Sequence, residues 1–186
     1  KTGLIAIGLD DGDELIGAEI TDGEFEVMMA TRRGQSIRFH EDQVRAMGRN
    51  ARGVKGITLD ENDFVIGMDV VKLGTDLLVV TEKGYGKRTA VDEYRLQSRG
   101  GKGIKTLRIS EKNGLIVGMR VVSDSDEMMF VTALGVLIRM KVKDISRYGR
   151  DTQGVKIMKL DDEDFVTTLA LVAIKDDEDD VQEELF

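Results

Sequence analysis

A segment of about 50 residues recurs three times along this chain of 186 residues, and this recurrence restricts the possible folds more than any other feature. TRRGQSIRF (31–39), TEKGYGKRT (81–89) and TALGVLIRM (132–140) align, with glycines and arginines 50 and 51 residues apart. A second element follows each at the same spacing: RAMGRNARGVKGITL (45–59), RLQSRGGKGIKTLRI (95–109) and RYGRDTQGVKIMKL (147–160). Repeats of this length with four strands each are typical of propeller blades.

Short β-rich runs separated by Gly, Asp or Asn make up each repeat. In IRMKV (138–142), apolar residues alternate with Arg139 and Lys141, which predicts a strand with one buried and one exposed face. EVMMAT and DLLVVT are continuous apolar runs, typical of strands that are buried on both faces. In the first repeat we expect strands at about 3–9, 14–20, 25–31 and 35–39. The sequence therefore predicts an all-β domain of four-stranded antiparallel blades.

The same period predicts the domain organisation. Residues 1–174 are expected to form about four blades, near 3–52, 53–102, 103–153 and a partial 154–174. Residues 175–186 are expected to form a disordered acidic tail, since 176–186 hold seven acidic residues and no basic one.

Basic residues follow the period of the repeat, although the net charge of the chain is −8. Residues 31–55 carry seven basic and two acidic residues, 83–108 carry eight and two, and 139–160 carry seven and two. Because equivalent positions of stacked blades fall on equivalent surfaces, three basic patches would align along one edge. Such a row suits a protein that follows a long polyanion. With three Tyr and no Trp, the chain favours contacts to a duplex backbone over base stacking on single strands.

These patches supply the candidate DNA-binding residues. Their side chains would neutralise phosphates, and the glycine-flanked loops would let backbone N–H groups approach phosphate oxygens. The basic candidates are Arg38, Arg45, Arg49, Arg52, Lys55, Lys87, Arg88, Arg95, Arg99, Lys102, Lys105, Arg139, Lys141, Arg147, Arg150 and Lys156.

Few residues suit catalysis or metal binding. Cysteine is absent, which excludes disulfides and thiolate chemistry and fits a reducing cytoplasm. His40 is the only histidine, and a single histidine at the end of a strand is more often structural than catalytic. GGKGIK (100–105) lacks the ending of a nucleotide phosphate-binding loop, and the acidic clusters lack the pattern of a calcium loop. No apolar run is long enough to span a membrane, and no signal-peptide pattern is present.

QSRGGKG (97–103) resembles the signature heptad Q-[RK]-R-G-G-[RK]-G of the DNA gyrase A C-terminal domain family. Ser98 departs from it at a position that is usually basic. The matching residues, which join the DNA-binding candidates, are Gln97, Arg99, Gly100, Gly101, Lys102 and Gly103. DGDELIG (11–17), VRAMGRN (44–50), GYGKRTAVDEY (84–94) and EKNGLIVG (111–118) resemble the same family, so the resemblance extends essentially from end to end.

The resemblance implies a β-pinwheel, a propeller-like disc whose neighbouring blades exchange a strand. It also implies that the domain wraps duplex DNA around its basic rim, which supports ATP-dependent negative supercoiling by the full enzyme. The implied partners are duplex DNA, the rest of gyrase A, and gyrase B, in a bacterial cytoplasm at the nucleoid. The catalytic tyrosine, ATP and Mg²⁺ belong to other domains, so no catalytic residue, cofactor or metal is expected here.

The family domain commonly has six blades. This chain has room for about four and resembles the C-terminal portion, so the principal heptad is expected upstream of Lys1. Two alternatives stay open, namely a topoisomerase IV C-terminal domain, which wraps DNA less, and a propeller scaffold for protein partners. The tail at 175–186 is expected either to compete with DNA for the basic rim or only to solubilise the chain.

Overall fold

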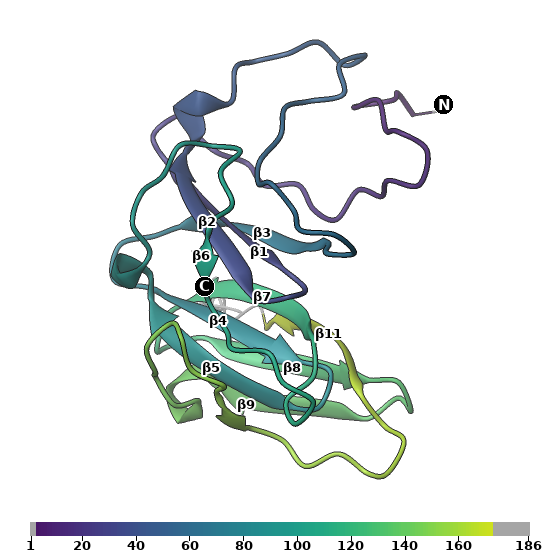
Figure 1. Cartoon of the computed structure of the whole chain (residues 1–186), viewed down its shortest axis with the longest axis vertical. Helices are drawn as coiled ribbons and strands as arrows, with labels where there is room; N and C mark the ends of the chain where they lie inside the picture. Colours follow the sequence, from purple (N-terminus) through teal and green to yellow (C-terminus); the bar gives the residue numbers. More distant parts are fainter. Residues whose placement is uncertain (1–2, 173–186) are drawn as a thin grey trace, which may run out of the picture.

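The computed structural model describes residues 3–172, and these form three antiparallel sheets that follow one another along the long axis (Figure 1). Blade A has the order β3-β1-β2-β6, blade B has the order β10-β5-β4-β7, and blade C has the order β11-β8-β9. The strands of blade A are β1 (Glu26–Thr31), β2 (Gln35–His40), β3 (Val65–Val71) and β6 (Ile104–Lys105). Those of blade B are β4 (Asp76–Thr81), β5 (Tyr85–Ala90), β7 (Ile116–Val122) and β10 (Val155–Lys156). Those of blade C are β8 (Glu127–Thr132), β9 (Leu137–Lys141) and β11 (Val166–Leu171).

Each blade combines strands from successive repeats. The hairpin β1–β2 comes from one repeat, its inner neighbour β3 from the next, and its outer neighbour β6 from the one after that. Blade B is assembled in the same way, with β7 and β10 beside the hairpin β4–β5. The expected all-β, propeller-like fold with strand exchange between blades is therefore confirmed.

A short 3-10 helix follows the outer strand of each hairpin: η1 (Glu41–Gln43), η2 (Val91–Glu93) and η3 (Val142–Asp144). The three helical turns lie one below another along the left side of Figure 1. Each one leads directly into a basic segment of the sequence, so these segments begin on the same side of successive blades. Within residues 3–172 no helix is long and apolar enough to cross a membrane.

Two of the strands expected in the first repeat are confirmed and two are wrong. The runs at 25–31 and 35–39 form β1 and β2, but residues 3–25 contain no strand. The physical reason is the strand exchange. Residues 14–20 align with β3, β7 and β11, each of which pairs with a hairpin strand that begins about 40 residues earlier. Counted back from residue 14, that hairpin falls before residue 1, and Leu15, Ile16 and Ile20 are exposed.

The hydrophobic core lies between blades rather than inside a single sheet. Met28 of β1, Leu77 of β4 and Met119 of β7 belong to one buried cluster, which joins blade A to blade B. A second cluster joins blade B to blade C. Gly67 of β3 permits the close approach of adjacent inner strands, because a Cβ there would lie 2.8 Å from Cγ of Met119. Neighbouring blades are thus closely packed at the centre.

Blade C has no fourth strand among residues 3–172. The segments that supply β6 and β10 are about 50 residues apart, and the next one in this series falls beyond residue 186. Among the described residues the outer edge of β9 consequently has no partner strand, and Leu134 in the preceding turn and Leu137 at the start of β9 are 67% and 64% exposed.

Candidate nucleic-acid interface

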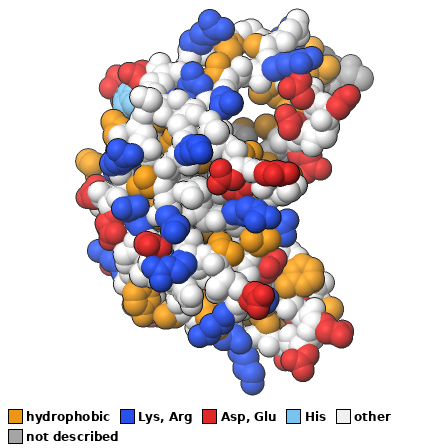
Figure 2. All heavy atoms as spheres, viewed as in Figure 1, with side chains coloured by type: hydrophobic (Ala, Val, Ile, Leu, Met, Phe, Trp, Pro, Cys, Tyr) orange, Lys and Arg blue, Asp and Glu red, His pale blue; other side chains and the backbone are white. Residues whose placement is uncertain are grey.

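The three basic segments touch one another in sequence order and form one continuous edge. The backbone N–H of Arg99 donates to Oε1 of Gln43 at 2.7 Å, and that of Gly100 donates to the carbonyl of Gly56 at 2.7 Å. One blade further on, the guanidinium of Arg150 lies 3.3 Å from the carbonyl of Lys105. Residues 43–56, 95–105 and 147–156 therefore lie side by side, and we call this row the basic edge. In Figure 2 Lys and Arg side chains are spread down the face shown, from the top of the molecule to the bottom.

Several predicted cations, all on this edge except Lys141 of β9, are free to meet a ligand. Their side chains are exposed and make no hydrogen bond or ion pair within residues 3–172. They are Arg45, Arg49, Lys55, Arg95, Lys102, Lys141 and Lys156. Arg52 pairs with Asp10 at 2.5 Å and Lys105 lies 3.9 Å from Asp151, but all four side chains are solvent-exposed. Exposed pairs of this kind contribute little to stability, so these two cations can exchange their partner for a phosphate.

Arg38 and Arg88, by contrast, point into the protein. The side chain of Arg38 is 16% exposed and donates to the carbonyls of Val91 and Tyr94 at 3.0 and 3.1 Å. The side chain of Arg88 is 11% exposed and donates from Nε to the carbonyl of Ile145 at 2.7 Å. Both guanidiniums therefore connect the hairpin of one blade to the segment that enters the next.

Lys87 is also buried. Its Nζ donates to the carbonyl of Gly149 and, at 2.6 Å, to that of Arg150, so it holds the third basic segment from below. Burial lowers the pKa of Lys87 to about 8, against a weaker opposing effect of the carboxylates of Glu93 and Asp151.

Arg139 occupies the same repeat position as Arg38 and Arg88 but has a different environment. It pairs with Glu127 of its own blade at 2.5 Å, and its side chain is 61% exposed. Within residues 3–172 its guanidinium makes no hydrogen bond to a backbone carbonyl of a following segment. The arginine at this repeat position is therefore nearly buried in the first two repeats and exposed in the third.

Most of the heptad-like stretch binds the preceding blade. The guanidinium of Arg99 donates to the carbonyls of Gln43 and Lys55 at 3.0 and 2.5 Å, and the backbone N–H of Gln97 donates to the carbonyl of Arg38 at 2.9 Å. The remaining contacts come from its glycines: the carbonyls of Gly100 and Gly101 accept hydrogen bonds from Thr58, and Gly103, with φ of +72°, lies against the carbonyl of Ser36. Lys102 is left exposed at the tip.

A buried carboxylate that sequence reasoning missed organises the joint between blades B and C. Asp76, at the start of β4, accepts two hydrogen bonds from Arg147 at 2.9 and 2.5 Å and lies 3.4 Å from Arg88. Hydrogen bonding to Asp76 raises the pKa of the Arg147 guanidinium. A signal was present in the sequence, because an acidic residue stands 12 positions before the arginine in every repeat: Glu26 and Arg38, Asp76 and Arg88, Glu127 and Arg139.

A family model and individual relatives both relate this chain to DNA gyrase A. A family described as "DNA gyrase C-terminal domain, beta-propeller" matches residues 1–22, 26–72, 75–123 and 126–173. The DNA gyrase A protein of Halalkalibacterium halodurans is 62% identical over 185 residues, which are 100% of this chain and 22% of the relative. The gyrase A protein of Escherichia coli is 46% identical over 179 residues, which are 96% of this chain and 20% of the relative. The chain thus spans about a fifth of the length of these relatives.

Solved structures show the same likeness. A structure of the DNA gyrase A C-terminal domain matches with a TM-score of 0.86 and 30% identity, over 92% of this chain and 58% of that one. The C-terminal domain of a DNA topoisomerase IV matches with a TM-score of 0.85 and 27% identity, over 90% of this chain and 52% of that one.

Proposed function

Because the chain belongs to the DNA gyrase C-terminal domain family, we propose that it binds duplex DNA along the basic edge and bends it, as a non-catalytic part of a gyrase A protein. The family to which QSRGGKG pointed is confirmed by the match. A role in ATP-dependent negative supercoiling, assembly with the rest of gyrase A and with gyrase B, and a place in a bacterial cytoplasm are parts of the same proposal.

The continuity of the basic edge is the observation that carries this proposal. Three segments from three repeats are joined by the contacts of Arg99 and Arg150, so their free cations lie along one path. A duplex presents phosphates along its whole length, and each cation that neutralises one releases a counterion. The edge passes from blade to blade, so a duplex that follows it must curve with the blades.

The candidate residues divide into two roles. We propose that the exposed cations contact phosphates: Arg45, Arg49, Arg52, Lys55, Arg95, Lys102, Lys105, Arg139, Lys141 and Lys156. The others hold the edge in place through hydrogen bonds or close contacts to other parts of the chain: Arg38, Lys87, Arg88, Gln97, Arg99, Gly100, Gly101, Gly103, Arg147 and Arg150.

A topoisomerase IV domain remains the nearest alternative, since the solved structures resemble the chain about equally. The match of the whole chain to gyrase A proteins favours gyrase. We propose that residues 1–174 contribute to about four blades. Three are the blades A, B and C, and residues 3–25 would complete a fourth together with an upstream hairpin. The acidic tail at 175–186 lies outside the described residues.

Binding across a salt series tests the proposal. A duplex of about 100 base pairs should bind with an affinity that falls steeply with salt, and Lys102→Ala should lower the slope of log K against log salt by about 0.9. Lys72→Ala, in the exposed β3–β4 turn outside the basic edge, is the matched control and should leave the slope unchanged. Nicked circles ligated in the presence of the protein should show a shifted linking number. Duplex affinity that does not depend on salt, or no binding at all, would favour the protein-docking scaffold.

A further inference from the structure

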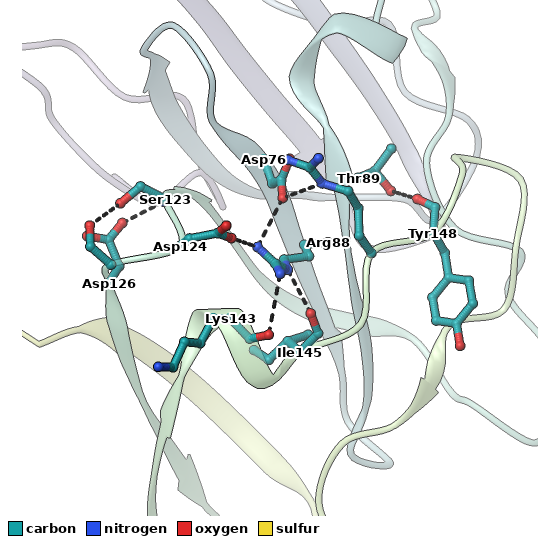
Figure 3. Close-up of polar contacts among 11 residues, drawn as sticks. Asp76, Arg88, Thr89, Ser123, Asp124, Asp126, Lys143, Ile145 and Tyr148 are labelled. Atoms are coloured by element: carbon teal, nitrogen blue, oxygen red, sulfur yellow. Dashed lines mark hydrogen bonds and ion pairs between the residues drawn. The ribbon is translucent and has the colours of Figure 1, made fainter.

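The side chain of Arg88 joins four separate segments of the chain (Figure 3). It leaves β5 of blade B, donates to the carbonyls of Ile145 and Lys143 at 2.7 and 3.4 Å, and pairs with Asp76 and Asp124. Lys143 and Ile145 belong to η3 and its end, and Asp124 lies in the turn between β7 and β8. One guanidinium thus ties the hairpin of blade B to both ends of the hairpin of blade C.

The backbone of Arg88 strengthens the same joint. Its N–H donates to the carbonyl of Ser146 at 3.2 Å, and its carbonyl accepts from the N–H of Tyr148 at 2.9 Å. Residues 145–148 lead directly into the third basic segment. Arg88 therefore fixes where that segment starts relative to blade B.

Arg38 makes the equivalent joint between blades A and B. Its guanidinium donates to the carbonyls of Val91, the first residue of η2, and of Tyr94, which follows η2, while Glu26 of its own blade neutralises it. Its carbonyl accepts from the N–H of Gln97, near the start of the second basic segment. The same construction thus recurs at both blade junctions within residues 3–172.

We propose that Arg38 and Arg88 are positioning residues that set the angle between neighbouring blades, and through it the curvature that the basic edge imposes on DNA. This inference rests on the proposed function for its DNA part. The two guanidiniums are nearly buried, and Nε and Nη1 of both already donate to acceptors inside the chain, so a phosphate reaches these groups only if the joint opens. A row of phosphate contacts on rigidly joined blades converts the blade angle directly into a bend of the duplex.

Arg139 is a control supplied by the chain itself. It has the same repeat position and the same kind of acidic partner as Arg38 and Arg88, but its guanidinium makes no contact outside its own blade within residues 3–172. Arg139→Ala removes the same charge as Arg88→Ala without touching a blade junction. Comparing the two substitutions therefore distinguishes the effect of a lost blade junction from the effect of a lost phosphate contact.

The experiment measures the salt slope of duplex affinity and the linking-number shift at saturating protein for wild type, Arg88→Ala, Arg88→Lys, Arg139→Ala and Lys72→Ala. Arg88→Ala should keep the salt slope and reduce the linking-number shift by about twofold, because the blades bind but are no longer held at one angle. Arg88→Lys should behave as Arg88→Ala, since an ammonium lacks the forked donors that reach two carbonyls and two carboxylates. Arg139→Ala, which removes a proposed phosphate contact, should lower the slope by about 0.9. Lys72→Ala, outside the basic edge, is the control and should leave both the slope and the linking-number shift unchanged.

Two outcomes overturn the inference. A loss of about one unit of slope in Arg88→Ala would make Arg88 a phosphate contact. Unchanged slope together with an unchanged linking-number shift would show that the joint does not set the curvature. If Arg88→Ala does not fold, Asp124→Asn gives the same test, because it weakens one exposed contact of the joint and keeps Arg88.

A second measurement separates this inference from the proposed function. The chain contains no cysteine, so spin labels attached at Glu111→Cys in blade B and Leu134→Cys in blade C report the distance between these blades without DNA. Arg88→Ala should broaden the distance distribution, and Arg139→Ala should leave it narrow. If neither protein binds DNA, a broadened distribution still supports the joint, whereas a narrow distribution in Arg88→Ala refutes it.

Discussion

The hairpins β4–β5 and β8–β9 are copies of one another in sequence, yet the next repeat covers only the first. The carbonyl of Gly84 accepts hydrogen bonds from the N–H groups of Ile157 and Met158 at 2.9 and 3.3 Å, and β10 pairs with β5. At the equivalent Gly135, a Cβ would meet nothing within 4 Å, and β9 has no outer partner among residues 3–172. Whether a hairpin residue is buried or exposed in this fold therefore depends on whether a segment of a later repeat packs against it.

The largest expected difference between a covered and an uncovered hairpin is in the contribution of a core isoleucine to the free energy of unfolding. Ile37 is fully buried under the second basic segment, and Ile138 at the same repeat position is only half-buried. Ile37→Ala should lower the free energy of unfolding by about 3 to 4 kcal/mol, and Ile138→Ala by about half of that. Urea denaturation of both variants measures the difference. Equal losses would mean that covering by the next repeat does not determine burial.

The glycine at the hairpin turn gives the next effect in size. Gly84 and Gly135 both have positive φ, +74° and +83°, so alanine is strained at either position. At Gly84 a Cβ would also lie 2.9 Å from the carbonyl oxygen of Met158. Gly84→Ala should therefore cost about 3 kcal/mol and Gly135→Ala about 1 kcal/mol. Thermal unfolding of the two variants checks this, and similar midpoints would contradict the close approach of residues 157–158 to Gly84.

A further effect is a pH dependence of stability that blade B has and blade C lacks. Lys87 is buried with a pKa lowered to about 8 from an ordinary value of 10.5, whereas Ile138 stands at the same position in blade C. Between these two pH values the unfolded chain binds more protons than the folded one, so this group should make the protein more stable as the pH rises through 8 to 10.5.

Denaturation at a series of pH values tests this in Lys87→Met, which should lose the rise. Lys102→Met removes an exposed lysine of the basic edge and should keep the rise in stability. The prediction fails if the two variants follow wild type in parallel across this range.

The sequence predicted the parts of the fold that depend on local patterns. The spacing of Gly34, Gly84 and Gly135 predicted the hairpins, and alternation in 138–142 predicted β9. The pairing of Gln35 and Ser36 with Lys105 and Ile104 joins residues about 70 positions apart, and no local pattern reports it. For that reason the strands expected at 3–9 and 14–20 were wrong.

The sequence shows where the basic residues lie along the chain, but their exposure could not be predicted from it. Arg38, Arg88 and Arg139 occupy the same position of the repeat, and their side chains are 16%, 11% and 61% exposed. The difference arises from carbonyls of the following repeat, which face the first two guanidiniums. An acidic residue 12 positions before each arginine was the one local sign that these side chains have internal partners.

Because each blade takes strands from later repeats, the exchange of strands also determines when each blade can be completed during synthesis. A ribosome releases the chain from its N-terminus, so the hairpin of blade A is complete at residue 40, its inner strand ends at residue 71, and its outer strand arrives only at residue 105. Blade B waits in the same way from residue 90 until residue 156. At every moment the growing chain therefore carries an unfinished blade with an open strand edge, which is the feature most prone to wrong pairing. A premature stop at a repeat boundary would release a protein that has lost strands from two blades rather than one.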